Sequence, residues 1–158
     1  MSLFSWLEAT QVAQTIGQSL MLTAWLSATH LIGFTIVMGG AVLINLRLLG
    51  AVLPSLSPAD VAKPVNRAIM LGLVVSVITG LLLFSARATA IAGNAAFQSK
   101  MLMLVVAAAV QLLTHRSLIR RESQFGAAAS TRYWLAGALG MLLWLGLAVA
   151  ACWFILFE

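Results

Sequence analysis

The sequence predicts an all-α integral membrane protein: an up-down bundle of four transmembrane helices with an N-terminal interfacial amphipathic helix. Of its 158 residues, 62% are hydrophobic and 8% are charged, whereas soluble domains carry about 25% charged residues. A helix crosses the hydrocarbon with about 20 apolar residues, and three stretches are that long without an ionised side chain. They lie between Glu8 and Arg47, between Arg67 and Arg87, and between Arg132 and Glu158.

We expect one transmembrane domain over residues 1–158, with spans at about 21–49, 65–86, 98–118 and 132–157. The third span is short because Lys100 and Arg116 flank it, but both side chains can reach the headgroups along their aliphatic stems. The connection from Pro54 to Pro64 is rich in helix breakers, so the second helix is expected to begin after it. Short connections favour antiparallel neighbours.

Residues 3–19 alternate apolar and polar side chains at helical spacing, which predicts a helix lying in the membrane interface; a disordered tail is the alternative. Ser5 and Glu8 have the spacing of a capping box. The segment has no basic residue and contains Glu8, so we do not expect a cleaved signal peptide.

The net charge of +5 comes mainly from cations in the predicted connections. Three lie after the first span and four after the third, against two on the opposite side: Arg47, Lys63, Arg67; Arg116, Arg120, Arg121, Arg132; Arg87, Lys100. Positive residues concentrate on the cytoplasmic side, which predicts that both termini lie away from the cytoplasm. Because these cations belong to loops, nucleic acid is not expected as a partner.

Burying a polar side chain inside a span costs free energy, so each one is a candidate for a structural or functional role. His30 is the strongest site candidate, because a neutral imidazole needs a partner for its N–H and can offer its other nitrogen to a metal. Equally, the ring can simply tie two helices together through a backbone carbonyl or a hydroxyl. Gly33, one turn later, leaves room beside it.

His115 ends the third span, with Gln111 one turn before it, and is either a ligand or an interfacial histidine. A histidine on each of two helices suggests a b-type haem. At 1.5 Å per residue, His30 lies about 15 Å and His115 about 25 Å from the outer surface, an offset of roughly 10 Å. A site with His30 and Met101 or Met103, or with one ligand, is the alternative.

Copper is the rival metal, because histidine and methionine suit it, with His30 and Met101 or Met103 as ligands. Gly72, Ser76 and Gly80 put small groups on one helix face, for helix packing or for a flat cofactor. The sequence has no constellation for hydrolysis or phosphoryl transfer. Its one cysteine, Cys152, excludes an intrachain disulfide and is expected to be a packing residue.

Five segments together resemble DUF6644, a bacterial family of small four-span membrane proteins of unknown function. They are Trp6-Leu7-Glu8-Ala9-Thr10, His30-Leu31-Ile32-Gly33, Asn45-Leu46-Arg47-Leu48-Leu49-Gly50, Thr79-Gly80-Leu81-Leu82-Leu83-Phe84 and Asn94-Ala95-Ala96-Phe97-Gln98-Ser99-Lys100-Met101. More distantly, the first-span histidine, Lys100 and His115 look like the copper-resistance CopD membrane domain and the HemJ-type protoporphyrinogen oxidases.

Two positions depart from the family pattern. Asn45 stands where the family usually has an aspartate, so an ion pair with Arg47 is in doubt, and Asn66-Arg67-Ala68 replaces a Pro-Trp pair. The resemblance implies a shared fold with His30 and Lys100 as its marked residues, in a superfamily that handles haem or copper.

We therefore expect a haem b subunit of the bacterial inner membrane, with periplasmic termini, that passes electrons to an outer-face redox partner. His30 is its axial ligand, His115 is the second ligand or serves another site, and Lys100 and Arg87 pair with haem propionates. Copper handling is one alternative. The other is a cofactor-free accessory subunit that binds a larger complex through its small-residue face. Expected partners are the lipid bilayer and other membrane or periplasmic redox subunits, or a second copy; a stand-alone enzyme is not expected.

Overall fold

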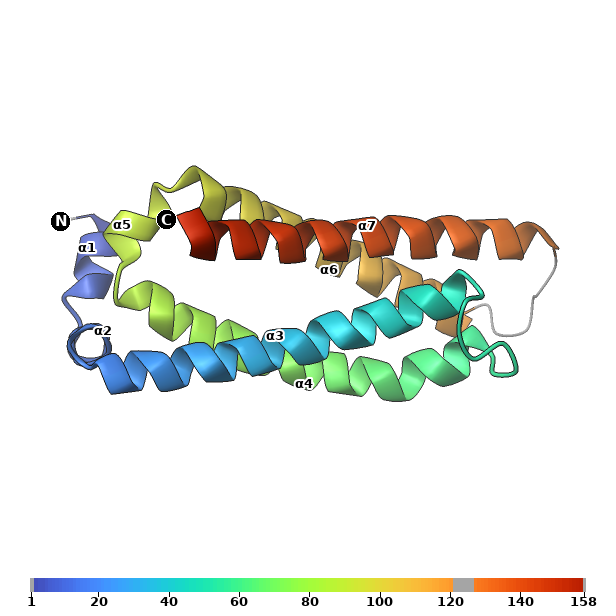
Figure 1. Ribbon diagram of the computed structural model, residues 1–158, viewed down its shortest axis with the longest axis horizontal. Coiled ribbons are helices and arrows are strands. Elements are labelled where there is room, and N and C mark those ends of the chain that lie inside the picture. Colours follow the sequence, from blue (N-terminus) through green and yellow to red (C-terminus); the bar gives the residue numbers. More distant parts are fainter. Residues whose placement is uncertain (1, 121–126, 158) are drawn as a thin grey trace.

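A computed structural model describes residues 2–120 and 127–157, with side chains for 2–117 and 131–151. The described chain is helical throughout its regular structure (Figure 1). Its helices are α1 (Leu3–Glu8), α2 (Gln11–Gln18), α3 (Leu20–Leu48), α4 (Pro58–Ser85), α5 (Ala88–Ala92), α6 (Ala95–Arg120) and α7 (Ala127–Phe157).

Four of these helices, α3, α4, α6 and α7, are long and apolar enough to cross a bilayer. They alternate in direction, and both chain ends lie at the same end of the bundle, here called the outer end (Figure 1). The most extensive packing joins α3 to α4, and α7 packs on both α3 and α6. The predicted fold class, a four-span membrane bundle, is confirmed.

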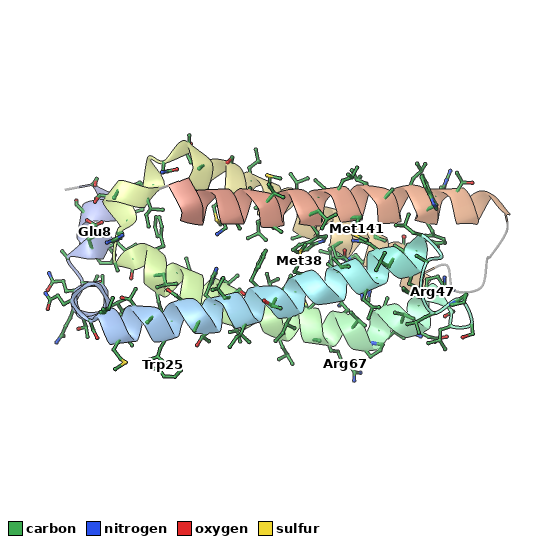
Figure 2. All side chains as sticks on the ribbon, in the orientation of Figure 1. Glu8, Trp25, Met38, Arg47, Arg67 and Met141 are labelled. Carbon is green, nitrogen blue, oxygen red and sulfur yellow. The ribbon has the colours of Figure 1, made fainter. Side chains whose placement is uncertain are left out.

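Side chains divide along the helices as a membrane bundle requires. Figure 2 shows Trp25 and Arg67 pointing away from the bundle, and Met38 and Met141 pointing between α3 and α7. The buried core lies toward the inner end and draws on four helices: Val37, Ala41, Ile44, Leu48, Ala62, Ile69, Ala107, Trp144 and Leu147. The predicted packing role of Cys152 lies outside the described side chains.

Helix α4 begins earlier than the sequence predicted. Pro58 occupies its first turn, where a missing N–H costs nothing, and the Ser57 hydroxyl caps the helix by accepting from the Asp60 N–H at 3.1 Å. Pro64 lies inside the helix and withholds one bond from the Asp60 carbonyl, but Asp60 and Pro64 are both exposed. The expectation that residues 54–64 cannot be helical is therefore wrong for 58–64.

The N-terminal segment forms two helices instead of the single helix expected over 3–19. Thr10 breaks the segment and caps α2, where its hydroxyl accepts from the Ala13 N–H at 3.3 Å. The predicted capping box between Ser5 and Glu8 is wrong, because Ser2 caps α1. As predicted, α2 buries its apolar side and exposes its glutamines.

Glu8 instead joins α1 to α5. Its carboxylate accepts from the Thr89 backbone N–H at 2.9 Å and from the Thr89 hydroxyl at 2.8 Å. Since α5 has no side-chain cap of its own, Glu8 supplies one from another helix. Phe4 meets Phe84 edge-on, and Phe84 stacks on Phe97. These contacts hold α1 and α5 over the outer end.

Candidate functional site

His30 lies in the outer half of α3 and is fixed by the facing residues of α4. Its Nδ1 lies 2.9 Å from the Ser76 carbonyl oxygen and 3.3 Å from the Thr79 hydroxyl oxygen. A carbonyl oxygen only accepts, so Nδ1 carries the proton, and Thr79 donates its own hydrogen to the Val75 carbonyl at 2.7 Å. Nε2 is then the ring nitrogen with a lone pair.

The same stretch of α4 is the small-residue face that the sequence singled out. An ideal Cβ at Gly33 would lie 2.7 Å from Ser76 Oγ, and one at Gly72 would lie 2.7 Å from the Gly33 carbonyl oxygen. A Cβ at Gly80 would meet His30 Cε1 at 3.0 Å. This face is therefore used for close packing of α3 on α4. It is not open to a flat cofactor or to another subunit.

His115 lies far from His30. On α7, Gly140 faces Asn45 of α3 and Gly146 faces Met103 of α6, which sets the relative levels of the helices. At 1.5 Å per residue these levels separate the two histidines by about 25 to 30 Å along the bundle. The expected offset of roughly 10 Å is too small, because α3 extends ten residues beyond His30 at its outer end, whereas α6 begins near the level of His30.

Of the other predicted site residues, Lys100 lies in the outer half of the bundle, as His30 does. It is half-buried on α6, and its charge acts electrostatically on the His30 ring. Arg87 is exposed at the start of α5. Met101 is exposed on α6, and the Met103 methyl packs toward Gly146 of α7. The structure thus brings Lys100 toward His30 and directs Met103 toward another helix.

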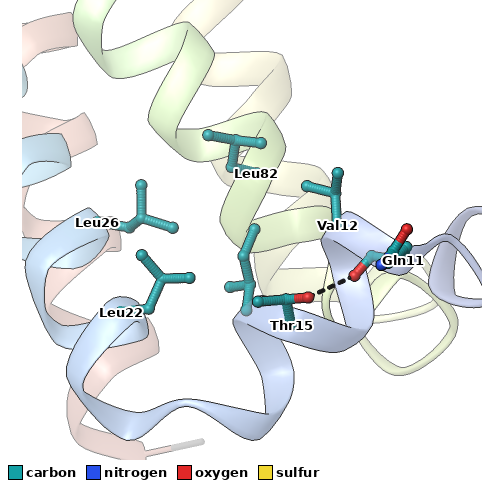
Figure 3. A pocket seen from close by; sticks show the side chains of 7 residues that line it. Gln11, Val12, Thr15, Leu22, Leu26 and Leu82 are labelled. Carbon is teal, nitrogen blue, oxygen red and sulfur yellow. Dashed lines mark hydrogen bonds between the residues drawn. The ribbon is translucent and has the colours of Figure 1, made fainter.

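An open, mostly apolar groove of about 390 Å³ lies between α2, α3 and α4 (Figure 3). Leu26 stands one turn outward from His30, and Leu82 one turn outward from Thr79. The Thr15 hydroxyl, on the rim, donates to the Gln11 carbonyl at 2.8 Å. The groove therefore offers hydrocarbon contacts one helical turn outward from His30. Within the described residues, no group of three His, Cys, Asp or Glu side chains could hold a metal ion.

The sequence predicted, as one alternative, that His30 ties two helices together through a backbone carbonyl or a hydroxyl, and the structure has both contacts on α4. Which residues supply them was not predicted, although the spacing of Ser76 and Thr79 on one face of α4 was the available signal. The burial of Trp144 at the bundle centre was also not predicted, because the apolar residues around it do not indicate which side of the span faces the core.

No curated protein and no solved structure matches the chain. A model for a family of unknown function, DUF6644, matches residues 3–157. The match covers nearly the whole chain, and the chain belongs to the DUF6644 family.

Proposed function

We propose that this protein is a haem b-binding membrane subunit, with His30 as the axial ligand, that passes electrons between the membrane and an outer-face redox partner. One observation carries the proposal: the hydrogen bond from His30 Nδ1 to the Ser76 carbonyl at 2.9 Å. Histidines that bind metals almost always donate their other N–H to a carbonyl or carboxylate, which fixes the tautomer and the ring orientation. His30 has this arrangement, with Nδ1 on the Ser76 carbonyl.

The surrounding residues fit a haem held by a single histidine. Nε2 keeps the lone pair that iron would need, Lys100 brings a cation into the same half of the bundle, and Leu26 and Leu82 supply apolar contacts one turn outward. They do not fit a haem shared by His30 and His115, because the separation of about 25 to 30 Å, at 1.5 Å per residue, far exceeds the reach of two iron–nitrogen bonds.

Haem supplies one-electron chemistry when bound. The residues of this chain would hold and tune it. The Ser76 carbonyl and Thr79 hydroxyl hold the imidazole in one tautomer and orientation. Lys100 and Arg87 offer positive charge for the propionates, where charge-assisted hydrogen bonds are strongest. Leu22, Leu26 and Leu82 of the neighbouring groove offer apolar contacts to the hydrocarbon edge of a macrocycle.

The orientation in the bacterial inner membrane also belongs to this proposal. Arg47, Arg67 and Arg116 lie toward the inner end, opposite the termini, as Figure 2 shows for the first two. Positive residues favour the cytoplasmic side, so the termini would be periplasmic. His30, in the outer half, would then exchange electrons with a periplasmic partner or with another membrane subunit near that face.

An absorption spectrum of the purified protein, oxidised and then reduced with dithionite, tests the haem. We expect a Soret band and an α-band that shift on reduction, that disappear in His30→Ala, and that persist in His115→Ala. Because His30→Ala also removes a helix contact, His30→Gly with added imidazole is the matched control, and exogenous imidazole should restore the spectrum. Wild-type protein without these bands, or His30→Ala with them, would contradict the proposal.

Metal analysis of the same preparation separates the copper alternative. Haem binding predicts iron in proportion to the Soret absorbance and no stoichiometric copper. Copper at one ion per chain, retained by wild type and lost in His30→Ala together with a colourless preparation, would favour copper handling instead. Stoichiometric co-purified subunits with neither metal would favour an accessory subunit that binds its partners through a surface other than the small-residue face, which packs against α3.

A further inference from the structure

Four buried nitrogen atoms in the inner half of the bundle have no hydrogen-bond partner among the described residues. They are Asn45 Nδ2, Gln111 Nε2, His115 Nδ1 and Trp144 Nε1. Asn45 and Trp144 are each 2% exposed and Gln111 is 6% exposed. In hydrocarbon surroundings an unsatisfied polar group costs several kcal/mol, so four of them together indicate a missing partner.

These groups come from three helices but lie in neighbouring layers of one core. The Asn45 carboxamide faces α7 at Gly140, where an ideal Cβ would lie 2.5 Å from Asn45 Oδ1. Trp144 is one turn outward from Gly140 on the same face of α7. On α6, Ala107 shares the core cluster with Trp144, and Gln111 lies one turn inward from it.

His115 continues the row. It is one further turn inward from Gln111, on the same face of α6. Its Nδ1 is buried, but the residue as a whole is half-buried. The row therefore runs from a half-buried histidine near the inner end to two fully buried groups, Asn45 and Trp144, deep in the bundle.

The chemistry of these atoms defines the missing partner. The indole N–H is only a donor, and the amide nitrogens of Asn45 and Gln111 are donors as well, so the partner must present acceptor oxygens. No member of the row carries a permanent charge, so the partner is neutral. Ala41 and Leu147, in the same core cluster, are 0% exposed, and such packing favours the smallest neutral acceptor, which is water.

We propose that Asn45, Gln111, His115 and Trp144 form a water-binding site in the inner half of the bundle, open to the inner surface at His115. Bound waters accept from Asn45, Gln111 and Trp144, with at most two of these N–H donors on any one water oxygen, and link the row to the His115 ring. Because the row has no fixed charge, it admits water and offers nothing to hold an ion. The site is independent of whether His30 binds haem.

Nuclear magnetic resonance of the full chain in detergent, with tryptophan labelled at the indole nitrogen, tests the site. Trp144→Phe identifies the Trp144 signal. We expect its Nε1–H to show cross-relaxation with water despite its burial. Asn45→Leu and Gln111→Leu should each remove that cross-peak, whereas the matched control Ile44→Val, in the same core cluster but without a polar atom, should keep it. Trp25 is exposed on the side of α3 that faces away from the bundle, and its indole signal serves as the reference for contact with detergent.

Two outcomes would overturn the proposal. A Trp144 Nε1–H with cross-peaks only to aliphatic protons, and with no exchange into deuterated water over days, would mean a dry core. A Trp144 signal without a water peak that shifts saturably with decylubiquinone would mean that a carbonyl ligand is the acceptor. The melting temperatures of the variants give an independent measurement. Removing an unpaired donor from a dry core is neutral or stabilising, whereas losing a bound water lowers the melting temperature. If Asn45 and Trp144 bind the same water, the decreases in melting temperature caused by Asn45→Leu and Trp144→Phe should be less than additive.

Discussion

Replacing Gly72 by alanine would perturb the closest approach between α3 and α4. An ideal Cβ at this position lies 2.7 Å from the Gly33 carbonyl oxygen and 3.0 Å from Ile36 Cβ. Ordinary van der Waals contact begins at 3.4 Å. Backbone cannot rotate away as a flexible side chain can, so the two helices must separate locally by about 0.7 Å, the difference between 3.4 and 2.7 Å.

This separation acts on stability and on the histidine site together. Overpacking of a tight contact costs about 1 to 3 kcal/mol, and alanine returns up to about 1 kcal/mol of helix propensity. We therefore expect Gly72→Ala to be destabilising by about 1 kcal/mol net. The bond from His30 Nδ1 to the Ser76 carbonyl, now 2.9 Å, would open to about 3.6 Å, beyond useful hydrogen-bonding length.

Reversible unfolding in mixed micelles, with increasing sodium dodecyl sulfate and followed by circular dichroism, measures the change. The matched control is Gly39→Ala on α3, because a Cβ at Gly39 meets nothing within 4 Å. That variant should be as stable as wild type or up to about 1 kcal/mol more stable. If Gly72→Ala unfolded at the same detergent fraction as Gly39→Ala, the close contact would not exist in the membrane protein. Our reading of the glycine face as a packing surface would then fail.

Two further substitutions test the Glu8 cap of α5 and the proline inside α4. Glu8→Ala removes the acceptor for the Thr89 N–H and should cost about 1 kcal/mol of local stability, seen as faster hydrogen exchange at α5; Gln14→Ala, on the exposed face of α2, should leave this exchange unchanged. If α5 exchanged equally fast in both, the Glu8 cap would be unnecessary. Pro64→Ala restores an N–H for the Asp60 carbonyl and should stabilise α4 by up to about 3 kcal/mol, raising the unfolding midpoint; a lower midpoint would show that Pro64 is required by its surroundings.

The membrane fold could be predicted because hydrocarbon rejects charge. Stretches without ionised side chains have few structural alternatives once they reach the length of a span. The first residue of α4 could not be predicted, because proline favours a helix in its first turn and disfavours it in the interior. Pro58 is favourable in the first turn of a helix, and Pro64 is tolerated because it and Asp60, whose carbonyl loses a partner, are exposed. Neither fact is visible before the start of the helix is known.

The site could be predicted only one residue at a time. The sequence identified His30 as the buried imidazole that needs a partner, but not that Ser76 and Thr79 would provide it. The levels of His30 and His115 depend on where each helix enters the bundle, and α5 takes up chain before α6 begins. Likewise, Asn45 and Trp144 lie 99 positions apart in the sequence, and only the packing of α7 against α3 brings them into adjacent layers.

The two proposed sites are separated by a dry layer, and this limits how they can interact. On α3, the residues between His30 and Asn45 that face the core are Val37, Ala41 and Ile44, each no more than 2% exposed. About 22 Å of helix, at 1.5 Å per residue, lies between the two polar side chains. Water bound near Asn45 therefore has no polar path to His30 along this face. A change of charge at His30 must be balanced from the outer end, because an uncompensated charge in so dry an interior would cost several kcal/mol. Lys100 and Arg87, the cations of that end, can balance added negative charge there but oppose added positive charge.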